Sequence, residues 1–235
     1  MTKLIDADLT AERPRLDLRV LGRFVATVDG SEVPADRWPG LRATHLVQLL
    51  SLAPQHRLRR EQVIDALWPE LGPEAGAANL RKAAHHVRQA LGRHDAVVLQ
   101  GGDVALWPHG RVTVDADSFE RGAQNALSSR DRTAGAKTAS EYGGDLLPGS
   151  PYEAWTESAR ERLHGRYTEL LRASGQWEQL AHVEPTDEPA HRELMVLELA
   201  SGNRAAAVRW YARLRDALQQ QLGVRPDRED RKSVV

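Results

Sequence analysis

The stretch that decides the fold is residues 60–92, which read REQVIDALWPELGPEAGAANLRKAAHHVRQALG. Within it, residues 61–68 place four apolar side chains on one face of a short helix. Pro69 and the Gly72-Pro73 pair then end that helix, because both residue types disrupt a regular backbone. The pattern predicts a short helix, a tight connection and the start of another helix.

A longer helix is predicted from about residue 75 to residue 91. At 3.6 residues per turn its apolar residues form one narrow stripe: Leu80, Ala84, Val87 and Leu91. Gly92 is suited to cap the C-terminal end, because glycine adopts the left-handed conformation at little cost. The stripe must face the core, so the opposite side faces solvent. That side carries Lys82, His85, His86 and Gln89, with Ala78, Asn79 and Arg93 alongside and Arg81 and Arg88 on one flank.

This helix is a basic island in a chain whose formal net charge is −1 at pH 7. Between Glu74 and Asp95 there is no acidic residue, and there are four cations: Arg81, Lys82, Arg88 and Arg93. Arg and Lys pair with phosphates or guanine edges, and Asn and Gln can bind adenine through two hydrogen bonds. The alternative interpretation of such an island is a solvated helix face.

The flanking sequence gives the helices their context. Residues 18–28 are rich in β-formers and end at the turn dipeptide Asp29-Gly30, and a further helix runs from Leu41 until Pro54 stops it. After the basic helix, residues 96–100 and 104–107 form two short β runs joined through Gly101-Gly102-Asp103. Three helices followed by a β-hairpin predict a winged helix-turn-helix fold.

From Asp117 onward the strand signals disappear and amphipathic helices dominate. We expect helices at residues 119–127, 133–142, 152–172, 190–200 and 204–222. Ser201-Gly202-Asn203 makes a tight turn between the last two, and this helix pair has the size of one tetratricopeptide-like unit of roughly 34 residues. An ordinary helical hairpin is the alternative. Repeats of this kind bind partners in grooves and do no chemistry.

The predicted fold class is therefore an α+β winged helix-turn-helix domain followed by an all-α, tetratricopeptide-like domain. The expected organisation is a flexible tail at residues 1–15, the DNA-binding domain at 16–114, the helical domain at 115–225 and a charged tail at 226–235. The first fifteen residues of the chain hold no apolar run long enough for a signal peptide or membrane span, so the protein is expected to be cytoplasmic.

Several kinds of chemistry are not expected. The chain has no cysteine, so it forms no disulfide and no thiolate metal site. His85 and His86 are adjacent and point about 100° apart on a helix, so they do not chelate one metal. No Walker-type glycine-rich loop occurs, and no nucleophile, base and orienting group cluster at motif spacing. We expect no cofactor, no metal and no enzymatic activity.

The motifs together resemble a known family. Residues 18–22 (LRVLG), 60–69 (REQVIDALWP) and 79–81 (NLR) look like the DNA-binding domain of the Streptomyces antibiotic regulatory protein family. Residues 114–120 (VDADSFE), 142–149 (YGGDLLPG) and 222–226 (LGVRP) resemble the bacterial transcriptional activator domain that follows it. The resemblance implies a transcriptional activator that binds repeated DNA sites and whose helical domain supports dimer contacts and recruitment of RNA polymerase.

The predicted interface with double-stranded DNA has three parts. The basic helix enters the major groove, residues near helix starts contact phosphates, and the β-hairpin wing touches the minor groove. The phosphate contacts are expected from Arg42, Thr44, Arg59 and Arg60. The helix is expected to contribute Asn79, Arg81, Lys82, His85, His86, Arg88, Gln89 and Arg93. His109 and Arg111 are the cations nearest the predicted wing.

A rival hypothesis keeps the winged helix but gives it no role in DNA binding. The protein is then a sensory or scaffolding module that binds another protein or an effector in its helical domain. The charged ending at residues 226–235 also leaves two interpretations open, a compact regulator or a fragment of a longer one. RNA polymerase and a second copy of the chain are the expected protein partners. The sequence of the DNA site is not predicted, because residues 81–87 (RKAAHHV) depart from the family pattern.

Overall fold

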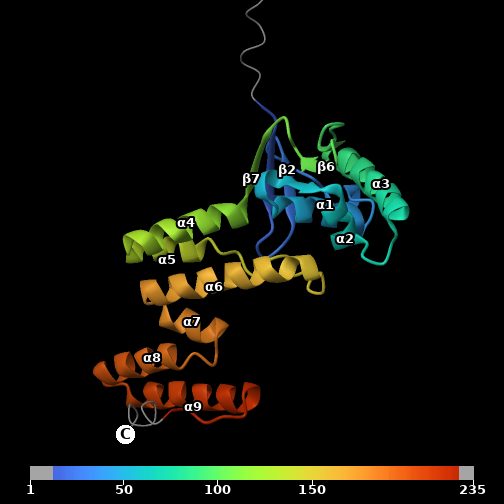
Figure 1. Ribbon diagram of the computed structural model, residues 1–235. Coiled ribbons are helices and arrows are strands. Elements are labelled where there is room, and N and C mark those ends of the chain that lie inside the picture. Colours follow the sequence, from blue (N-terminus) through green and yellow to red (C-terminus); the bar gives the residue numbers. More distant parts are fainter. Residues whose placement is uncertain (1–12, 228–235) are drawn as a thin grey trace, which may run out of the picture. The chain divides into compact units, whose positions relative to one another are not determined.

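The computed structural model describes residues 13–227 (Figure 1). The chain divides into two compact units, each formed from two stretches of sequence. Unit 1 contains the residues up to Ser118 together with Gly143–Glu161, and unit 2 contains Phe119–Tyr142 together with the residues from Arg162 onward. The sequence predicted a boundary near residue 115; in the structure the second stretch of unit 1 comes from beyond it.

Unit 1 opens with a four-stranded sheet in the order β3-β2-β1-β7. Strands β1 (Arg15–Arg19) and β2 (Val25–Val28) pair antiparallel with Leu18 opposite Ala26, and β3 is Ser31–Glu32. Strand β7 (Arg111–Val114) pairs parallel with β1. The side chains of β1 alternate between exposed and buried, as expected of a strand with one face on a core. The sequence did not predict β7.

Three helices pack against one another in unit 1: α1 (Leu41–Ser51), α2 (Arg60–Leu67) and α3 (Pro73–Leu91). A short helical turn, η1, at Ala35–Arg37 precedes them, and another, η2, at Pro54–His56 lies between α1 and α2. Their core is fully buried and apolar, with Leu46, Leu50, Leu67, Leu80 and Val87. The predicted stripe on α3 is confirmed, and Ala83 and Ala90 widen it.

The β-hairpin that follows α3 is also confirmed. Strand β5 (Val97–Gln100) pairs antiparallel with β6 (Asp103–Leu106) around the tip at Gly101 and Gly102. A third strand, β4 (Arg57–Arg59), pairs with the other edge of β6, so the wing is a three-stranded sheet in the order β4-β6-β5. Strand β4 was not predicted from the sequence, because it is only three residues long.

The stretch Gly143–Glu161 completes unit 1, although the sequence assigned it to the helical domain. The backbone N–H of Gly22 donates to the carbonyl oxygen of Asp145 over 2.9 Å, and that of Leu147 donates to Val20 over 2.9 Å. Leu21 and Leu146 form a β-bridge, and both side chains are buried. This stretch is therefore structural for the winged helix.

A buried histidine holds the same stretch against α1. The Nε2 of His45 lies 3.3 Å from the hydroxyl of Ser150, and its Nδ1 lies 3.4 Å from a carboxylate oxygen of Glu153. Its ring meets Trp155 edge to face at 5.9 Å. Burial lowers the pKa of His45 below its ordinary value, against the opposing effect of Glu153 and with the help of Arg42. His45 is therefore held neutral at physiological pH.

Unit 2 is entirely helical over the residues that the structure describes. Its helices are α4 (Asp115–Ser129), which begins in unit 1, α5 (Arg132–Ser140), α6 (Glu157–Ser174), α7 (Trp177–Val183), α8 (Glu188–Ala200) and α9 (Arg204–Gln221). The short turn η3 (Ala154–Thr156) precedes α6. The sequence predicted these helices except α7, so the fold class is confirmed.

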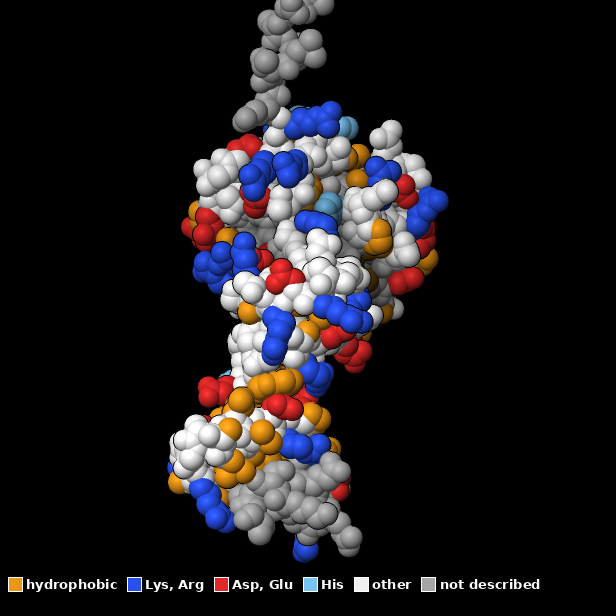
Figure 2. All heavy atoms as spheres, turned by 90° about the vertical axis from the view of Figure 1, so that its left-hand side faces the viewer, with side chains coloured by type: hydrophobic (Ala, Val, Ile, Leu, Met, Phe, Trp, Pro, Cys, Tyr) orange, Lys and Arg blue, Asp and Glu red, His pale blue; other side chains and the backbone are white. Residues whose placement is uncertain are grey.

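Aromatic stacking joins the first part of unit 2 to the second. The ring of Tyr142 stacks on Tyr167 at 4.2 Å and touches Phe119 at 5.0 Å. Farther along, hydrophobic side chains gather on the surface of α8 and α9 (Figure 2), where Val196, Leu197 and Val208 are about half exposed. None of the helices within residues 13–227 combines the length and the apolar character needed to cross a membrane.

Gly76 fixes how closely α2 and α3 approach. A Cβ atom at this position would lie 2.4 Å from Cγ2 of Ile64, far inside van der Waals contact. We expect Gly76→Ala to lower the free energy of unfolding by about 1–3 kcal/mol, because overpacking a core interface outweighs the gain in helix propensity. Gly165→Ala on α6 is the matched control, because its Cβ meets open space and should raise stability by up to about 1 kcal/mol. Chemical denaturation measures both, and equal effects would contradict the close approach.

The lowered pKa of His45 has a consequence for stability. Because the folded pKa lies below the unfolded value, the unfolded chain binds the extra proton first as the pH falls. The contribution of His45 is intact above about pH 6.5 and is lost as the pH falls through 6.5 toward the folded pKa. We expect His45→Gln to reduce the loss of stability between pH 7.5 and 5.5, measured by urea unfolding, while His109→Gln at an exposed position leaves it unchanged. An unaltered pH dependence in His45→Gln would refute this account.

Candidate nucleic-acid interface

Helix α3 presents a cationic and amide-bearing face to solvent. Arg81, Lys82, His85 and Gln89 are exposed, and Ala78 is a small exposed residue on the preceding turn. Asn79 and His86 are half buried at one edge of this face. The buried stripe fixes the rotation of the helix about its own axis, so Lys82, His85 and Gln89 face solvent as predicted, whereas His86 is half buried. Their contact with DNA stays a prediction.

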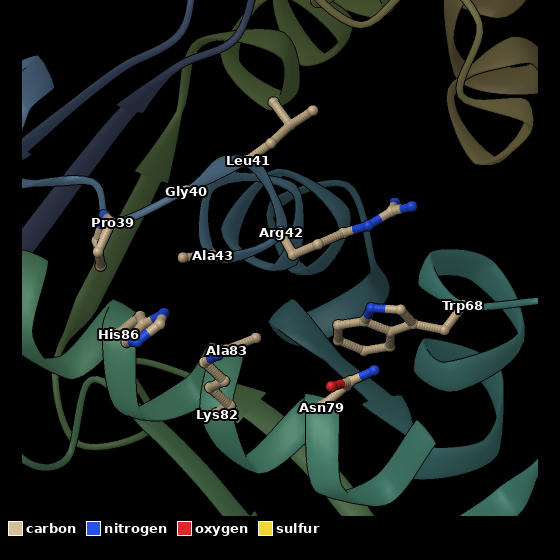
Figure 3. A pocket seen from close by; sticks show the side chains of 10 residues that line it. All are labelled: Pro39, Gly40, Leu41, Arg42, Ala43, Trp68, Asn79, Lys82, Ala83 and His86. Atoms are coloured by element: carbon tan, nitrogen blue, oxygen red, sulfur yellow. The ribbon is translucent and has the colours of Figure 1, made fainter. Parts of the chain in front are cut away.

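A hollow of about 290 Å³ lies between α3 and the start of α1. Figure 3 shows Pro39 to Ala43 along one wall and Asn79, Lys82, Ala83 and His86 along the other, with Trp68 at one end. No acidic residue lines this hollow, and Arg42 and Lys82 contribute positive charge from opposite walls. The hollow therefore has the chemistry of a binding site for an anionic group such as a phosphate.

The start of α1 adds donors to this hollow. The N-cap residue is Gly40, which offers no side-chain cap, and the first turn has no acidic residue. Helix N-termini bind anions because their first backbone N–H groups lack partners within the helix. Arg42 lies 3.7 Å from Glu153 and its side chain is 44% exposed, whereas Thr44 is half buried further along the helix. Arg42 is therefore the better placed of these two for a phosphate.

The tip of the wing carries two cations, Arg57 and Arg59. The sequence predicted Arg59 only as a residue near a helix start. Arg59 lies 3.3 Å from the Asp103 carboxylate, and its side chain is 66% exposed. Arg57 lies 3.4 Å from the same carboxylate and was not predicted as a site residue. The backbone N–H of Arg60 donates to Gly102 at the tip, and the Arg60 side chain is half buried. The pairing of β4 with β6 brings these residues together, and three residues of strand are too short a signal to find in sequence.

Two predicted cations of the α3 region already have partners. Arg88 donates from its Nε to the carbonyl oxygen of Val97 on β5 over 2.8 Å. Arg93 donates two hydrogen bonds to Asp95, over 3.0 and 3.1 Å, and lies 5.2 Å from the centre of the Trp107 ring. The hydrogen bond with Asp95 raises the pKa of Arg93, and the same bond lowers the pKa of Asp95. Arg88 ties α3 to β5, and Arg93 is held within the connection between them.

The two cations that the sequence predicted for the wing lie away from the hairpin tip. His109 is exposed in the turn between β6 and β7, and Arg111 begins β7, where its Cα pairs with that of Arg15. Arg111 lines a wide surface hollow together with Arg13, Arg15 and Arg93. The structure therefore brings Arg111 to the edge of the first sheet, whereas Arg57 and Arg59 are at the tip.

The bond from Arg88 to Val97 distinguishes a structural arginine from one available to a ligand. We expect Arg88→Ala to lower the free energy of unfolding by about 1 kcal/mol, because the β5 carbonyl loses a charged donor. Arg81→Ala, at an exposed position on the same helix, should change stability by less than about 0.5 kcal/mol. Urea unfolding of the two variants tests this, and equal stabilities would show that the bond contributes nothing.

Comparison with known proteins gives two findings. A family described as "Bacterial transcriptional activator domain" matches residues 114–232, which is half of the chain. The chain also shares its fold with a solved structure, Mycobacterium tuberculosis EmbR in complex with a low affinity phosphopeptide, with a TM-score of 0.64 and 20% sequence identity. That alignment covers 94% of this chain and 64% of the EmbR chain, so this chain spans less than two thirds of EmbR's length. No curated protein matches it.

These findings confirm the resemblance to the activator-domain part of the family named above and the fold class that it implied. The match includes residues 143–161, which the structure assigns to unit 1, as well as the helices of unit 2. A family defined by transcriptional activation consists of regulators and not of enzymes. The chain belongs to the bacterial transcriptional activator domain family.

Proposed function

We propose that the protein binds double-stranded DNA in a sequence-specific way and activates transcription from promoters that carry its sites in repeated copies. The observation that carries this proposal is the exposed face of α3, where Arg81, Lys82, His85 and Gln89 stand on a helix held by a buried apolar stripe. A helix of this kind fits the B-DNA major groove, which is about 12 Å wide.

Each part of the interface has its own task. Lys82 and Gln89 on α3 read base edges, because lysine donates to guanine and glutamine pairs with adenine. Arg42 and the N-terminal N–H groups of α1 bind a phosphate in the hollow beside α3. Arg57 and Arg59 at the hairpin tip approach the adjacent minor groove. Phosphate contacts position the protein on DNA, and the base contacts specify the site.

Unit 2 is the part that acts on protein partners. Its consecutive antiparallel helices, α7, α8 and α9, pack in the manner of tetratricopeptide-like repeats, which bind partners through their surfaces. We propose RNA polymerase as the partner that transmits activation and a second copy of the chain as the neighbour on repeated sites. Direct repeats require head-to-tail contacts, whereas a symmetric dimer requires palindromic half-sites.

The division between base contacts and phosphate contacts is testable by substitution. We expect Lys82→Ala and Gln89→Ala each to weaken binding to the selected site by about 1–3 kcal/mol, with little effect on random DNA. Arg42→Ala should weaken binding to both DNAs and reduce the salt dependence by about one counterion. Arg23→Ala, an exposed cation of the β1–β2 connection, is the matched control. Affinity measured by fluorescence anisotropy across a salt series gives all four values.

The selected site comes from enrichment of bound fragments from genomic DNA at near-physiological salt. Enrichment of one motif in repeated copies, lost in Lys82→Ala, supports sequence-specific binding by α3. If no motif is enriched and binding is weak and steeply dependent on salt, specific readout is excluded. In that case the protein acts in transcription through the contacts that unit 2 makes with other proteins.

A further inference from the structure

A second hollow, of about 430 Å³, lies wholly within unit 2, among α7, the α7–α8 connection, α8 and α9. Pockets for small molecules commonly measure about 300–1,000 Å³. Its lining is mixed: the apolar and aromatic residues Ala181, Pro185 and Trp210 stand beside two histidines, His182 and His191, and two opposite charges, Glu178 and Arg213. None of these residues was singled out as a site residue by the sequence.

The apolar wall is rigid and aromatic. His191 is buried, and its Nε2 lies 3.1 Å from the carbonyl oxygen of Pro185. Its ring meets Trp210 edge to face, with 5.7 Å between the ring centres. Burial lowers the pKa of His191, so this ring is neutral at physiological pH and contributes no charge to the hollow. Trp210 and Pro185 extend the same wall with flat, apolar surface.

The two charged groups at the hollow have no counter-charge of their own. Arg213 is exposed, and its guanidinium lies over the ring of Trp210 at 4.6 Å. Within residues 13–227 neither Arg213 nor Glu178 forms an ion pair, although ion pairs occur elsewhere in unit 2, such as Arg162 with Glu120 at 2.7 Å. A cation held on an aromatic face and an unpaired carboxylate thus border one cavity. A ligand that carries both charges would be complementary to this lining.

We propose that this hollow binds a small zwitterion with an apolar side chain, of the α-amino acid class. The ligand's carboxylate pairs with Arg213, its ammonium group pairs with Glu178, and its side chain packs on Trp210. The arginine is already oriented by the indole, so it loses little freedom when it binds a carboxylate. This site does not depend on DNA binding, and it gives the regulator a place at which a metabolite can act.

The test titrates the full 235-residue chain with L-phenylalanine, L-tryptophan and L-leucine by isothermal calorimetry. We expect at least one to bind, and we expect Arg213→Gln and Glu178→Gln each to weaken it by about tenfold, because each removes one charge-assisted contact. Arg209→Gln, an exposed cation one turn earlier on α9 that does not line the hollow, should bind as the unaltered chain does. Thermal unfolding without ligand establishes that the variants remain folded.

Two derivatives of the amino acid that binds separate the charges. Its N-acetyl form retains the carboxylate and loses the ammonium group, and its amide does the reverse, so both should bind at least tenfold more weakly. If the N-acetyl form binds equally well, the site takes a simple carboxylate such as a peptide C-terminus, and the proposal is wrong. It is equally wrong if none of the three amino acids binds, or if Arg213→Gln changes nothing.

Discussion

Three backbone N–H groups converge on the carboxylate of Asp115, and the arrangement of unit 1 depends on them. Val20 and Ala116 each donate over 2.8 Å, and Leu21 donates over 3.2 Å. Val20 and Leu21 follow β1, while Asp115 directly follows β7 and begins α4. One side chain therefore joins the first strand of the chain to the strand added after the wing. Burial raises the pKa of Asp115 in spite of these hydrogen bonds.

Much of this architecture could be predicted from sequence because its signals are local. The stripe on α3, the hairpin at Gly101 and Gly102 and the turn at Ser201 each lie within a short window of sequence, and each is present in the structure. Strands β4 and β7 could not be predicted. Their three or four residues carry little periodicity, and they form because distant partners, β6 and β1, are available at an open edge.

The candidate interface was predictable to the same extent. Helical periodicity correctly placed Lys82 and Gln89 at the surface, because a buried stripe determines which face is exposed. Periodicity could not show that Arg88 and Arg93 are occupied by Val97 and Asp95, since both partners lie beyond the helix. Nor could periodicity show that Arg57 lies at the wing tip. Charge alone identifies candidates, and tertiary contacts decide which cations remain available for a ligand.

The stretch from Gly143 to Glu161 has a consequence for how such regulators evolve. It is matched as part of the activator domain, yet it supplies Leu146 and Ser150 to the winged helix. If recombination replaced everything after residue 114 with another helical domain, Leu21 and His45 would lose their partners Leu146 and Ser150. The new domain would have to supply an equivalent stretch. The winged-helix unit is therefore encoded in two separated stretches of sequence, and an exchange of everything after residue 114 would remove the second of them.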